Sequence, residues 1–202
     1  MFKGIIPPVI TPLNRDGSID NQSFAEVIDY IIGGGAGGVI IGGTTGESPS
    51  MNEDEKLELF KSVKEAVGDS ATVIAGTTDN NTNESIDLSK KAEKLGVDAI
   101  LLTVPAYNKP TQDGLYKHFV KIADSVSIPG LLYNVPSRTS LNMDTDTTLK
   151  LAKIDNIVGV KEASSDPDQI TNIISDSPEN FKVWSGNDNE TFSIMSTGGH
   201  GV

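Results

Sequence analysis

Short apolar runs alternate with segments of helical periodicity along the chain, and this alternation limits the possible folds more than any other feature. The seven runs cover residues 4–10, 38–42, 71–75, 99–104, 130–135, 157–160 and 181–185. They are rich in Val, Ile and Leu without polar alternation, as in strands that are buried on both faces. One run follows another after about 30 residues, which is typical of parallel β-α-β units. The pattern therefore predicts an α/β fold.

Two of the intervening segments show helical periodicity most clearly. The first follows Asp20, a residue type that caps helix N-termini, and stops at the glycines of residues 33–35. The second ends at Gly68. Their apolar stripes consist of Phe24, Val27, Ile28, Ile31 and Ile32 in the first, and of Leu59, Phe60, Val63, Ala66 and Val67 in the second. We expect both helices to pack on the sheet through these stripes.

A doubly wound open sheet and a (β/α)8 TIM barrel both satisfy the alternation, so the positions of the polar residues decide between them. Polar groups follow the strands directly at residues 44–45, 107, 138 and 185–187. Groups from so many strand ends converge most easily at the C-terminal mouth of a barrel. The sequence thus favours the barrel, as a single domain over residues 1–202.

The expected barrel is incomplete. About seven β-α units fit into the chain, and an eighth strand would begin near residues 198–202. Such barrels usually need about 250 residues, whereas this chain has 202. We therefore expect a barrel truncated at the start of strand eight, without the following helical region and with open edges on the first and seventh strands.

Composition argues against several classes of partner. The net charge is −12 without a basic stripe, so binding to nucleic acid or to an anionic membrane is not expected. Cysteine is absent, and the two histidines, His118 and His200, lie far apart, which gives little basis for a metal site. Pro7, Pro8 and Pro12 interrupt the apolar N-terminus before a signal peptide could form. We expect a cytoplasmic protein.

Lys161 is the main candidate for a reactive group, because it follows the apolar run 157–160 directly. An amine at this boundary between barrel wall and open loop loses hydration, which lowers its pKa and allows it to attack a ketone. A lysine that extends its amine into solvent is the alternative. Lys109 is a second amine, but its position in a loop predicts full solvation and poor nucleophilicity.

Two other motifs carry groups suited to a small acidic substrate. The turn from Gly42 to Glu47 offers backbone N–H groups and two hydroxyls that can hold a carboxylate, although it can also be a simple strand-to-helix turn. It matches neither a Walker-type phosphate loop nor a dinucleotide fingerprint. In the second motif, Tyr133 near a strand end can transfer protons. Arg138, just after it, can bind a carboxylate in a bidentate manner, unless it only pairs with a surface aspartate.

These motifs together resemble the dihydrodipicolinate synthase family, within the pyruvate-dependent class I aldolase and N-acetylneuraminate lyase superfamily. The resemblance extends from Phe2 to Val202. It implies a lyase that condenses pyruvate with aspartate semialdehyde to 4-hydroxy-tetrahydrodipicolinate in lysine and diaminopimelate biosynthesis. The motifs that carry it are Gly43-Thr44-Thr45-Gly46-Glu47, Tyr107-Asn108-Lys109-Pro110, Tyr133-Asn134-Val135-Pro136-Ser137-Arg138-Thr139, Val160-Lys161-Glu162-Ala163 and Ser185-Gly186-Asn187-Asp188.

The resemblance also implies roles for individual residues. Lys161 would form an imine with pyruvate, and Tyr133, Thr44 and Tyr107 would relay protons, with Tyr107 supplied by a neighbouring subunit. Thr45 would bind the pyruvate carboxylate, Arg138 the carboxylate of the aldehyde, and Gly186 would contribute to substrate binding. The implied assembly is a homotetramer, a dimer of dimers, and no metal or organic cofactor is implied.

The resemblance further implies an allosteric lysine site at Ser48, Asn80 and Glu84. Family members often have a tyrosine where this chain has Ala106, and regulated ones have histidines near Glu53 and Lys56. The loss of an aromatic wall and the added like charge lead us to expect weak or absent inhibition by lysine.

Two alternatives to the synthase remain open at this point. A pyruvate-dependent sugar-acid aldolase or lyase shares the lysine and the tyrosine, but it needs hydroxyl-binding groups where this chain has Arg138. A non-catalytic barrel fragment is the other alternative, because the chain stops at Val202.

Overall fold

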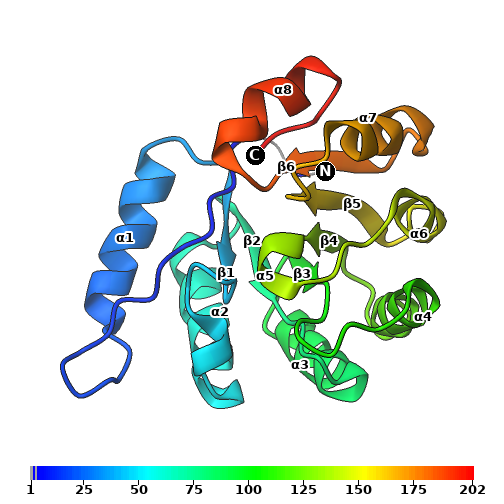
Figure 1. Ribbon diagram of the computed structural model, residues 1–202. Coiled ribbons are helices and arrows are strands. Elements are labelled where there is room, and N and C mark those ends of the chain that lie inside the picture. The colour runs from blue at the N-terminus through cyan, green and yellow to red at the C-terminus, as the bar shows by residue number, and fades with distance from the viewer. Residues whose placement is uncertain (1, 3) are drawn as a thin grey trace.

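Six parallel strands form one curled sheet in the computed structural model, which describes residue 2 and residues 4–202 (Figure 1). The strands are β1 (Gly38–Ile41), β2 (Thr72–Gly76), β3 (Ala99–Thr103), β4 (Gly130–Asn134), β5 (Ile157–Glu162) and β6 (Lys182–Ser185). Their order in the sheet is their order along the chain. In a doubly wound sheet the order of the strands reverses at a switch point. The unbroken order seen here therefore confirms the expected barrel wall and the α/β class.

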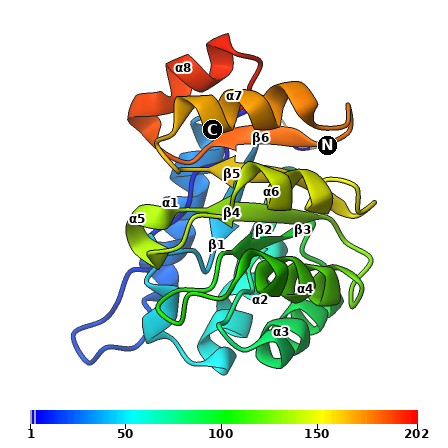
Figure 2. The same ribbon diagram turned by 45° about the vertical axis from the view of Figure 1, so that its right-hand side comes forward.

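Helices cover the outer face of the sheet and follow one another around it (Figures 1 and 2). They are α1 (Asn21–Gly33), α2 (Glu53–Val67), α3 (Thr82–Lys94), α4 (Gln112–Ala123), α6 (Thr145–Leu151), α7 (Pro167–Asp176) and α8 (Thr191–Ser196). The short helix α5 (Pro136–Thr139) and the 3₁₀ turns η1 (Ser48–Ser50) and η2 (Asp188–Glu190) follow strand ends instead. Asp20 caps α1 as predicted, because its side chain accepts a hydrogen bond from the Ser23 N–H. Helix α2 starts with a capping box of Asn52 and Glu55 and ends at Gly68.

The predicted strand over residues 4–10 is wrong, because this segment makes only one isolated bridge, between Pro8 and Ile40. The Val9 N–H donates to the Ile40 carbonyl over 3.0 Å, and the Ile40 N–H donates to the Pro7 carbonyl over 2.9 Å. Pro7 and Pro8 have no N–H, so a continuous ladder cannot form. The segment still occupies the first position of the barrel.

The expected open edges of the first and seventh strands are partly covered. Gly201 makes a parallel bridge to Trp184, and the Ser185 N–H donates to the Gly201 carbonyl over 2.9 Å. On the other side, the Ile6 N–H donates to the Val202 carbonyl, also over 2.9 Å. Residues 200–202 therefore lie between β6 and the N-terminal segment, in the position of an eighth strand.

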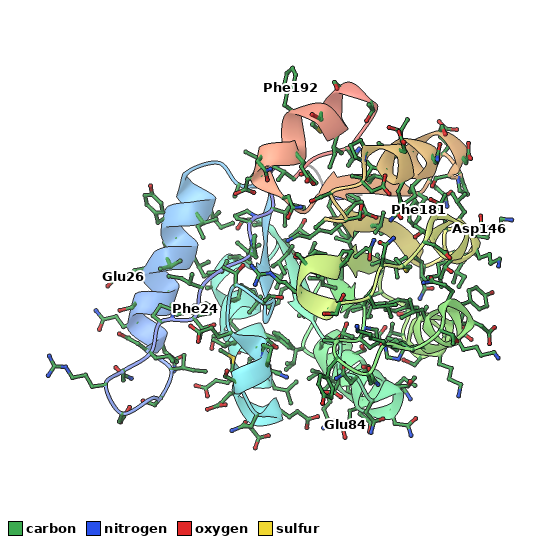
Figure 3. The ribbon with its side chains drawn as sticks, in the orientation of Figure 1. Phe24, Glu26, Glu84, Asp146, Phe181 and Phe192 are labelled. Carbon is green, nitrogen blue, oxygen red and sulfur yellow. The ribbon has the colours of Figure 1, made fainter. Side chains whose placement is uncertain are left out.

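Apolar side chains fill both the layer between sheet and helices and the inside of the curled sheet. Phe24 from α1 and Phe181 before β6 are buried in the outer layer, whereas Phe192 on α8 points away from the molecule (Figure 3). Ile40, Ile74, Leu101, Leu131, Tyr133 and Trp184 pack together on the inner face. Among the helices of the described residues, none combines the length and apolarity needed to cross a membrane.

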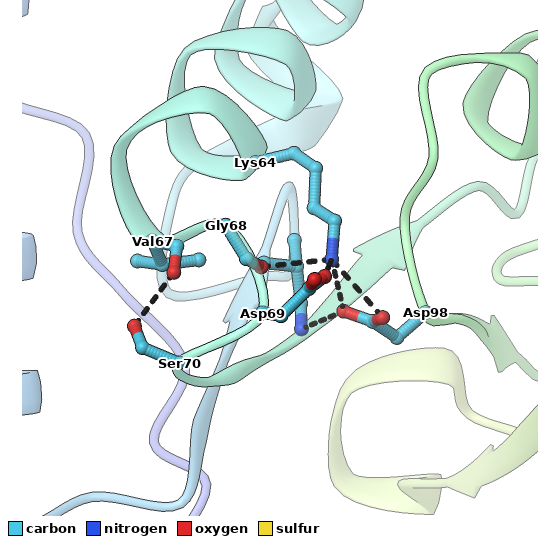
Figure 4. A network of polar contacts seen from close by, with 7 residues as sticks. Lys64, Val67, Gly68, Asp69, Ser70 and Asp98 are labelled. Atoms are coloured by element: carbon cyan, nitrogen blue, oxygen red, sulfur yellow. Dashed lines mark hydrogen bonds and ion pairs between the residues drawn. The ribbon is translucent and has the colours of Figure 1, made fainter.

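Lys64 joins α2 to the loop before β3, at the amino-terminal side of the sheet (Figure 4). Its ammonium donates to the Gly68 carbonyl over 2.9 Å and to both carboxylate oxygens of Asp98 over 3.1 Å. Asp98 also accepts from the Val73 N–H over 2.8 Å. The Lys64 side chain is only 17% exposed, so water cannot readily replace these bonds.

We expect Lys64→Met to lower the free energy of unfolding by about 2 kcal/mol, because it leaves the Gly68 carbonyl and the Asp98 carboxylate without their charged donor. Lys61→Met on the same helix is the control. Lys61 is well exposed and lies 3.9 Å from Glu65, so its loss costs less than about 0.5 kcal/mol. Urea unfolding followed by circular dichroism measures both, and equal losses would show that the Lys64 contacts add nothing.

Candidate active site

A cavity of about 700 Å³ lies at the carboxyl ends of the strands and brings most of the predicted site residues together. These are Thr44, Thr45, Tyr133, Arg138, Lys161 and Gly186. A second cavity of about 540 Å³ continues from Lys161 towards the apolar inside of the sheet, where Ile74 and Leu131 line it. The carboxyl edge of the sheet is therefore hollow where the sequence predicts chemistry.

Lys161 lies within β5, which extends to Glu162 and so continues two residues beyond the predicted end of this run. Lys161 is the register partner of Tyr133 on β4. The two side chains therefore lie side by side on the inner face of the sheet. The Lys161 Nζ is 4.8 Å from the centre of the Tyr133 ring. The amine and the phenol thus occupy neighbouring positions in the cavity.

Burial changes the proton affinities of both groups. Loss of hydration lowers the pKa of Lys161, and the negative charge of Asp188 partly opposes this effect. Loss of hydration raises the pKa of Tyr133, against the smaller effect of the positive Arg138. The amine therefore loses its proton more easily than a solvated lysine, while the phenol retains its own at neutral pH.

The turn after β1 places Thr44 and Thr45 in the lining of the cavity. Gly42 has φ of 68° and Glu47 has φ of 58°, so the chain turns sharply at both ends of the segment. A side chain at Gly46 would come within 2.9 Å of the Val9 carbonyl. Within residues 2 and 4–202, the N–H groups of Thr44 and Thr45 have no hydrogen-bond acceptor. The turn can therefore donate hydrogen bonds to an anion.

Arg138 lies on the short helix α5, at the rim of the same cavity. Its side chain is exposed, and it makes no ion pair with any carboxylate in the described part of the chain. The sequence had left open a surface pair with an aspartate. The guanidinium is instead available to a ligand.

Gly186 follows β6 directly and lies beside Lys161. A Cβ at this position would lie 3.2 Å from the Lys161 Cγ and 2.9 Å from the Ala163 Cβ. A side chain would therefore displace Lys161 or the loop after it.

Tyr107 does not line the cavity of the other predicted site residues. It is 92% exposed and has φ of 71°, and neighbouring Lys109 also has positive φ, at 44°. The Tyr107 side chain is therefore exposed outside this cavity, and its relay role in a neighbouring subunit stays a prediction.

An adjoining cavity of about 440 Å³, which shares Thr44 and Arg138 with the first, contains two of the three residues of the predicted lysine site, Ser48 and Asn80. Lys56 and Ala106 line it as well. Glu84 is not part of its lining and accepts a hydrogen bond from Asn81 at the start of α3 (Figure 3).

The two histidines have separate local partners. The His118 Nδ1 bonds the Thr82 hydroxyl over 2.9 Å, and the His200 Nε2 bonds the Phe2 carbonyl over 3.1 Å. In the part of the chain that the structure describes, no group of three or more His, Cys, Asp or Glu residues is arranged to hold a metal ion.

Sequence reasoning missed two carboxylates of the site. Asp188 lines both cavities that contain Lys161. From its motif, residues 185–188, only Gly186 had been predicted as a site residue. Glu162 lies behind the lysine, where it is fully buried, and burial raises its pKa from 4.5 to about 7. Its position in an apolar strand next to Lys161 was the only signal in the sequence.

A parallel barrel wall with a lysine and a tyrosine side by side at its carboxyl edge defines a (β/α)-barrel protein with a candidate amine-dependent site. The sequence profile of the Dihydrodipicolinate synthetase family matches residues 1–202, and the chain belongs to this family.

Similar proteins support the same assignment over nearly the whole chain. A 4-hydroxy-tetrahydrodipicolinate synthase of Moorella thermoacetica is 50% identical over 98% of this chain and 68% of its own length. The enzyme of that name from Bacillus subtilis is 46% identical, over all of this chain and 70% of its own length. Among solved structures, dihydrodipicolinate synthase DapA-2 of Bacillus anthracis matches with a TM-score of 0.98 and 42% identity, over all of this chain and 69% of its own. The chain thus spans about two thirds of these relatives.

We expect the stability of the protein to fall as pH rises through the pKa of Glu162. Because the folded pKa of about 7 exceeds the ordinary value of 4.5, folding favours the protonated carboxyl, and this contribution is lost as pH rises towards 8. The loss between pH 5 and pH 8 is about 2 to 3 kcal/mol. In Glu162→Gln the side chain cannot titrate, so this loss of stability between pH 5 and pH 8 should be absent.

Urea unfolding of both proteins at pH 5 and pH 8 measures the difference, and the remaining carboxylates are common to the two. Parallel pH dependence of wild type and variant would contradict the raised pKa.

Proposed function

We propose that the chain catalyses the condensation of pyruvate with aspartate semialdehyde to 4-hydroxy-tetrahydrodipicolinate through an imine on Lys161. The observation that carries the proposal is the desolvated Lys161 amine beside the Tyr133 phenol in a cavity at the strand ends. The names of the family relatives support the same reaction.

The proposed reaction starts when the neutral Lys161 amine attacks the ketone carbon of pyruvate and water leaves, which forms the imine. The protonated imine accepts electrons, so the methyl group of the bound pyruvate can lose a proton. This loss converts the imine into an enamine. The enamine carbon then bonds to the aldehyde carbon of aspartate semialdehyde, and the aldehyde oxygen takes up a proton and becomes the hydroxyl of the product. The α-amine that came from aspartate semialdehyde finally replaces the Lys161 amine at the imine carbon. This step closes the ring and frees the lysine.

Thr45 and the free N–H groups of the turn after β1 are the proposed site for the pyruvate carboxylate. They lie in the same cavity as Lys161 and have unused hydrogen-bond donors. Gly186 leaves the space beside the lysine in which the ketone can sit.

Tyr133 is the proposed proton carrier, since its phenol keeps its proton and lies beside the amine. Thr44 and Tyr107 complete the proposed relay. The exposure of Tyr107 suits donation to the site of a second copy. We therefore also propose an oligomer, with the family's dimer of dimers as its form, although one matched structure is described as a monomeric dihydrodipicolinate synthase variant.

Arg138 is the proposed partner of the aspartate semialdehyde carboxylate. Its exposed guanidinium faces the cavity without an internal ion pair. A sugar-acid substrate would present hydroxyls here, which a guanidinium recognises less specifically than a carboxylate.

The proposed chemistry needs no metal or organic cofactor, because the imine itself supplies the electron sink. We also propose that residues 1–202 fold as one domain, whose barrel wall carries Lys161 and Tyr133. We further propose that inhibition by lysine is weak or absent. Lys56 and Ala106 line the cavity that contains Ser48 and Asn80, and a cation there repels the ammonium group of a lysine ligand.

Incubation with pyruvate and sodium borohydride is expected to add one reduced pyruvate to the wild type and none to Lys161→Ala, because only the imine is reduced to a stable adduct. Lys109→Ala is the matched control, since Lys109 is a solvated amine in a loop, and it should react like the wild type. Intact mass spectrometry gives the result. A wild type without an adduct, or an adduct that survives in Lys161→Ala, would refute the proposed nucleophile.

Arg138→Gln should form the pyruvate adduct normally but lose about 100-fold in kcat/KM for aspartate semialdehyde, because it removes a bidentate carboxylate contact that orients the second substrate. A coupled assay of product formation measures the loss. Turnover of a keto-sugar acid in place of aspartate semialdehyde would instead identify the sugar-acid lyase.

A further inference from the structure

The outer face of the strand pair that carries Lys161 and Tyr133 holds a second, polar pair. Side chains alternate between the faces of a strand, so Glu162 and Asn134 point away from the cavity while their neighbours point into it. Asn134 and Glu162 are register partners, as are Tyr133 and Lys161. Both residues of the outer pair are fully buried. The amide Nδ2 of Asn134 donates to the Glu162 Oε1 over 3.1 Å and so joins the strands directly behind the lysine.

The same asparagine closes the loop that carries Arg138. The Met143 N–H donates to the Asn134 Oδ1 over 3.0 Å, and the Asn134 Nδ2 donates to the Met143 carbonyl over 3.3 Å. These bonds hold both ends of residues 135–142 together, and this stretch includes α5. The position of Arg138 therefore depends on the asparagine behind the sheet.

Helix α7 fixes the other side of this arrangement. The Gln169 Nε2 donates to the Met143 carbonyl over 3.2 Å, and the Asn142 Nδ2 donates to the Gln169 Oε1 over 2.8 Å. The Glu162 Oε1 also accepts from the Ser164 N–H over 2.8 Å, which fixes the loop after β5. We call Glu162, Asn134, Asn142 and Gln169 the rear network.

Packing alone does not require a carboxyl at this place. Val160, two residues before Glu162 on the same face of β5, packs among apolar side chains. A buried carboxyl costs free energy unless it is paired, and no cation lies within ion-pair distance of Glu162 among residues 2 and 4–202. Its partners are instead two hydrogen-bond donors, the Asn134 amide on β4 and the Ser164 N–H in the loop after β5. These directional bonds specify a geometry that an apolar residue could not specify.

We propose that Glu162 is a positioning residue for imine formation, which fixes Lys161, Tyr133 and the Arg138 loop from behind the barrel wall through the rear network. The inference rests on the proposed function. Glu162 touches no substrate, and its effect passes through the register of β4 and β5. Since a misplacement of about 1 Å can cost about 100-fold in rate, loss of the network would be visible in the chemistry.

The experiment compares the wild type with Glu162→Leu, Glu162→Gln and Val160→Ala. Two readouts are taken for each: the rate of pyruvate trapping by borohydride, and hydrogen exchange of the backbone amides in residues 135–143. Val160→Ala is the matched control, because it loosens the same face of β5 on the other side of Lys161 and leaves the rear network intact. Trp184, the only tryptophan, lines the Lys161 cavity and reports by fluorescence whether each variant has a native interior.

Glu162→Leu should trap pyruvate about 10 to 100 times more slowly and exchange faster in residues 135–143. Glu162→Gln should recover most of the rate, because its Oε1 can accept the same bonds. Val160→Ala should keep the wild-type rate and the exchange of residues 135–143. If Glu162→Leu does not fold, Gln169→Leu, which removes the bonds to Met143 and Asn142, takes its place with the same two expectations.

Equal losses in Glu162→Leu and Val160→Ala would overturn the inference, since the role would then be packing alone. Wild-type trapping in Glu162→Leu, or failure of Glu162→Gln to recover, would also overturn it. A wild type that traps no pyruvate would overturn the proposed function itself, and the positioning role with it, and is thereby distinguished from the other outcomes.

Discussion

The parallel pairing of β4 with β5 is the constraint on which the candidate site depends. Its register sets Tyr133 opposite Lys161 on the inner face and Asn134 opposite Glu162 on the outer face. A shift of β5 by one residue would turn Lys161 and Glu162 to the wrong faces while Tyr133 and Asn134 kept theirs, so that the amine would enter the layer under the helices and the carboxyl would enter the cavity. The hydrogen bond between Asn134 and Glu162 exists only in the observed register. The chemistry of the site and the pairing of the strands are therefore two consequences of one geometry.

Most of the fold could be predicted from the sequence, because the signals that determine it are local. Apolar runs without alternation predicted the positions of all six strands, and Asp20 and Gly68 predicted helix ends that the structure confirms. The N-terminal run was mistaken for a regular strand, since apolar content does not show that two prolines remove the donors of a ladder. The pairing of residues 200–202 was missed for another reason. Three residues carry no periodicity, and only their neighbours in space give them a strand position.

The site was predictable where reactive residues follow strands and unpredictable where burial decides. The motifs predicted six residues that share one cavity, because the carboxyl ends of parallel strands meet at one edge. Neither Asp188 nor Glu162 could be selected in this way. An exposed aspartate and a buried glutamate look alike in a sequence, and only the folded structure shows that Glu162 is fully buried. The exposure of Tyr107 likewise depends on a loop with positive φ, which no short motif specifies.

The two faces of β5 carry opposite electrostatic requirements. On the inner face, lost hydration lowers the pKa of Lys161, which the proposed imine chemistry needs. On the outer face, the same loss raises the pKa of Glu162, so that its charge is reduced where no cation could balance it. A fully charged carboxylate so close behind the lysine would favour the ammonium and oppose the nucleophile, whereas an apolar residue would leave the Asn134 amide and the Ser164 N–H without an acceptor. A glutamate with a raised pKa satisfies both conditions, because it accepts the hydrogen bonds that fix the strands while carrying only part of a charge near neutral pH.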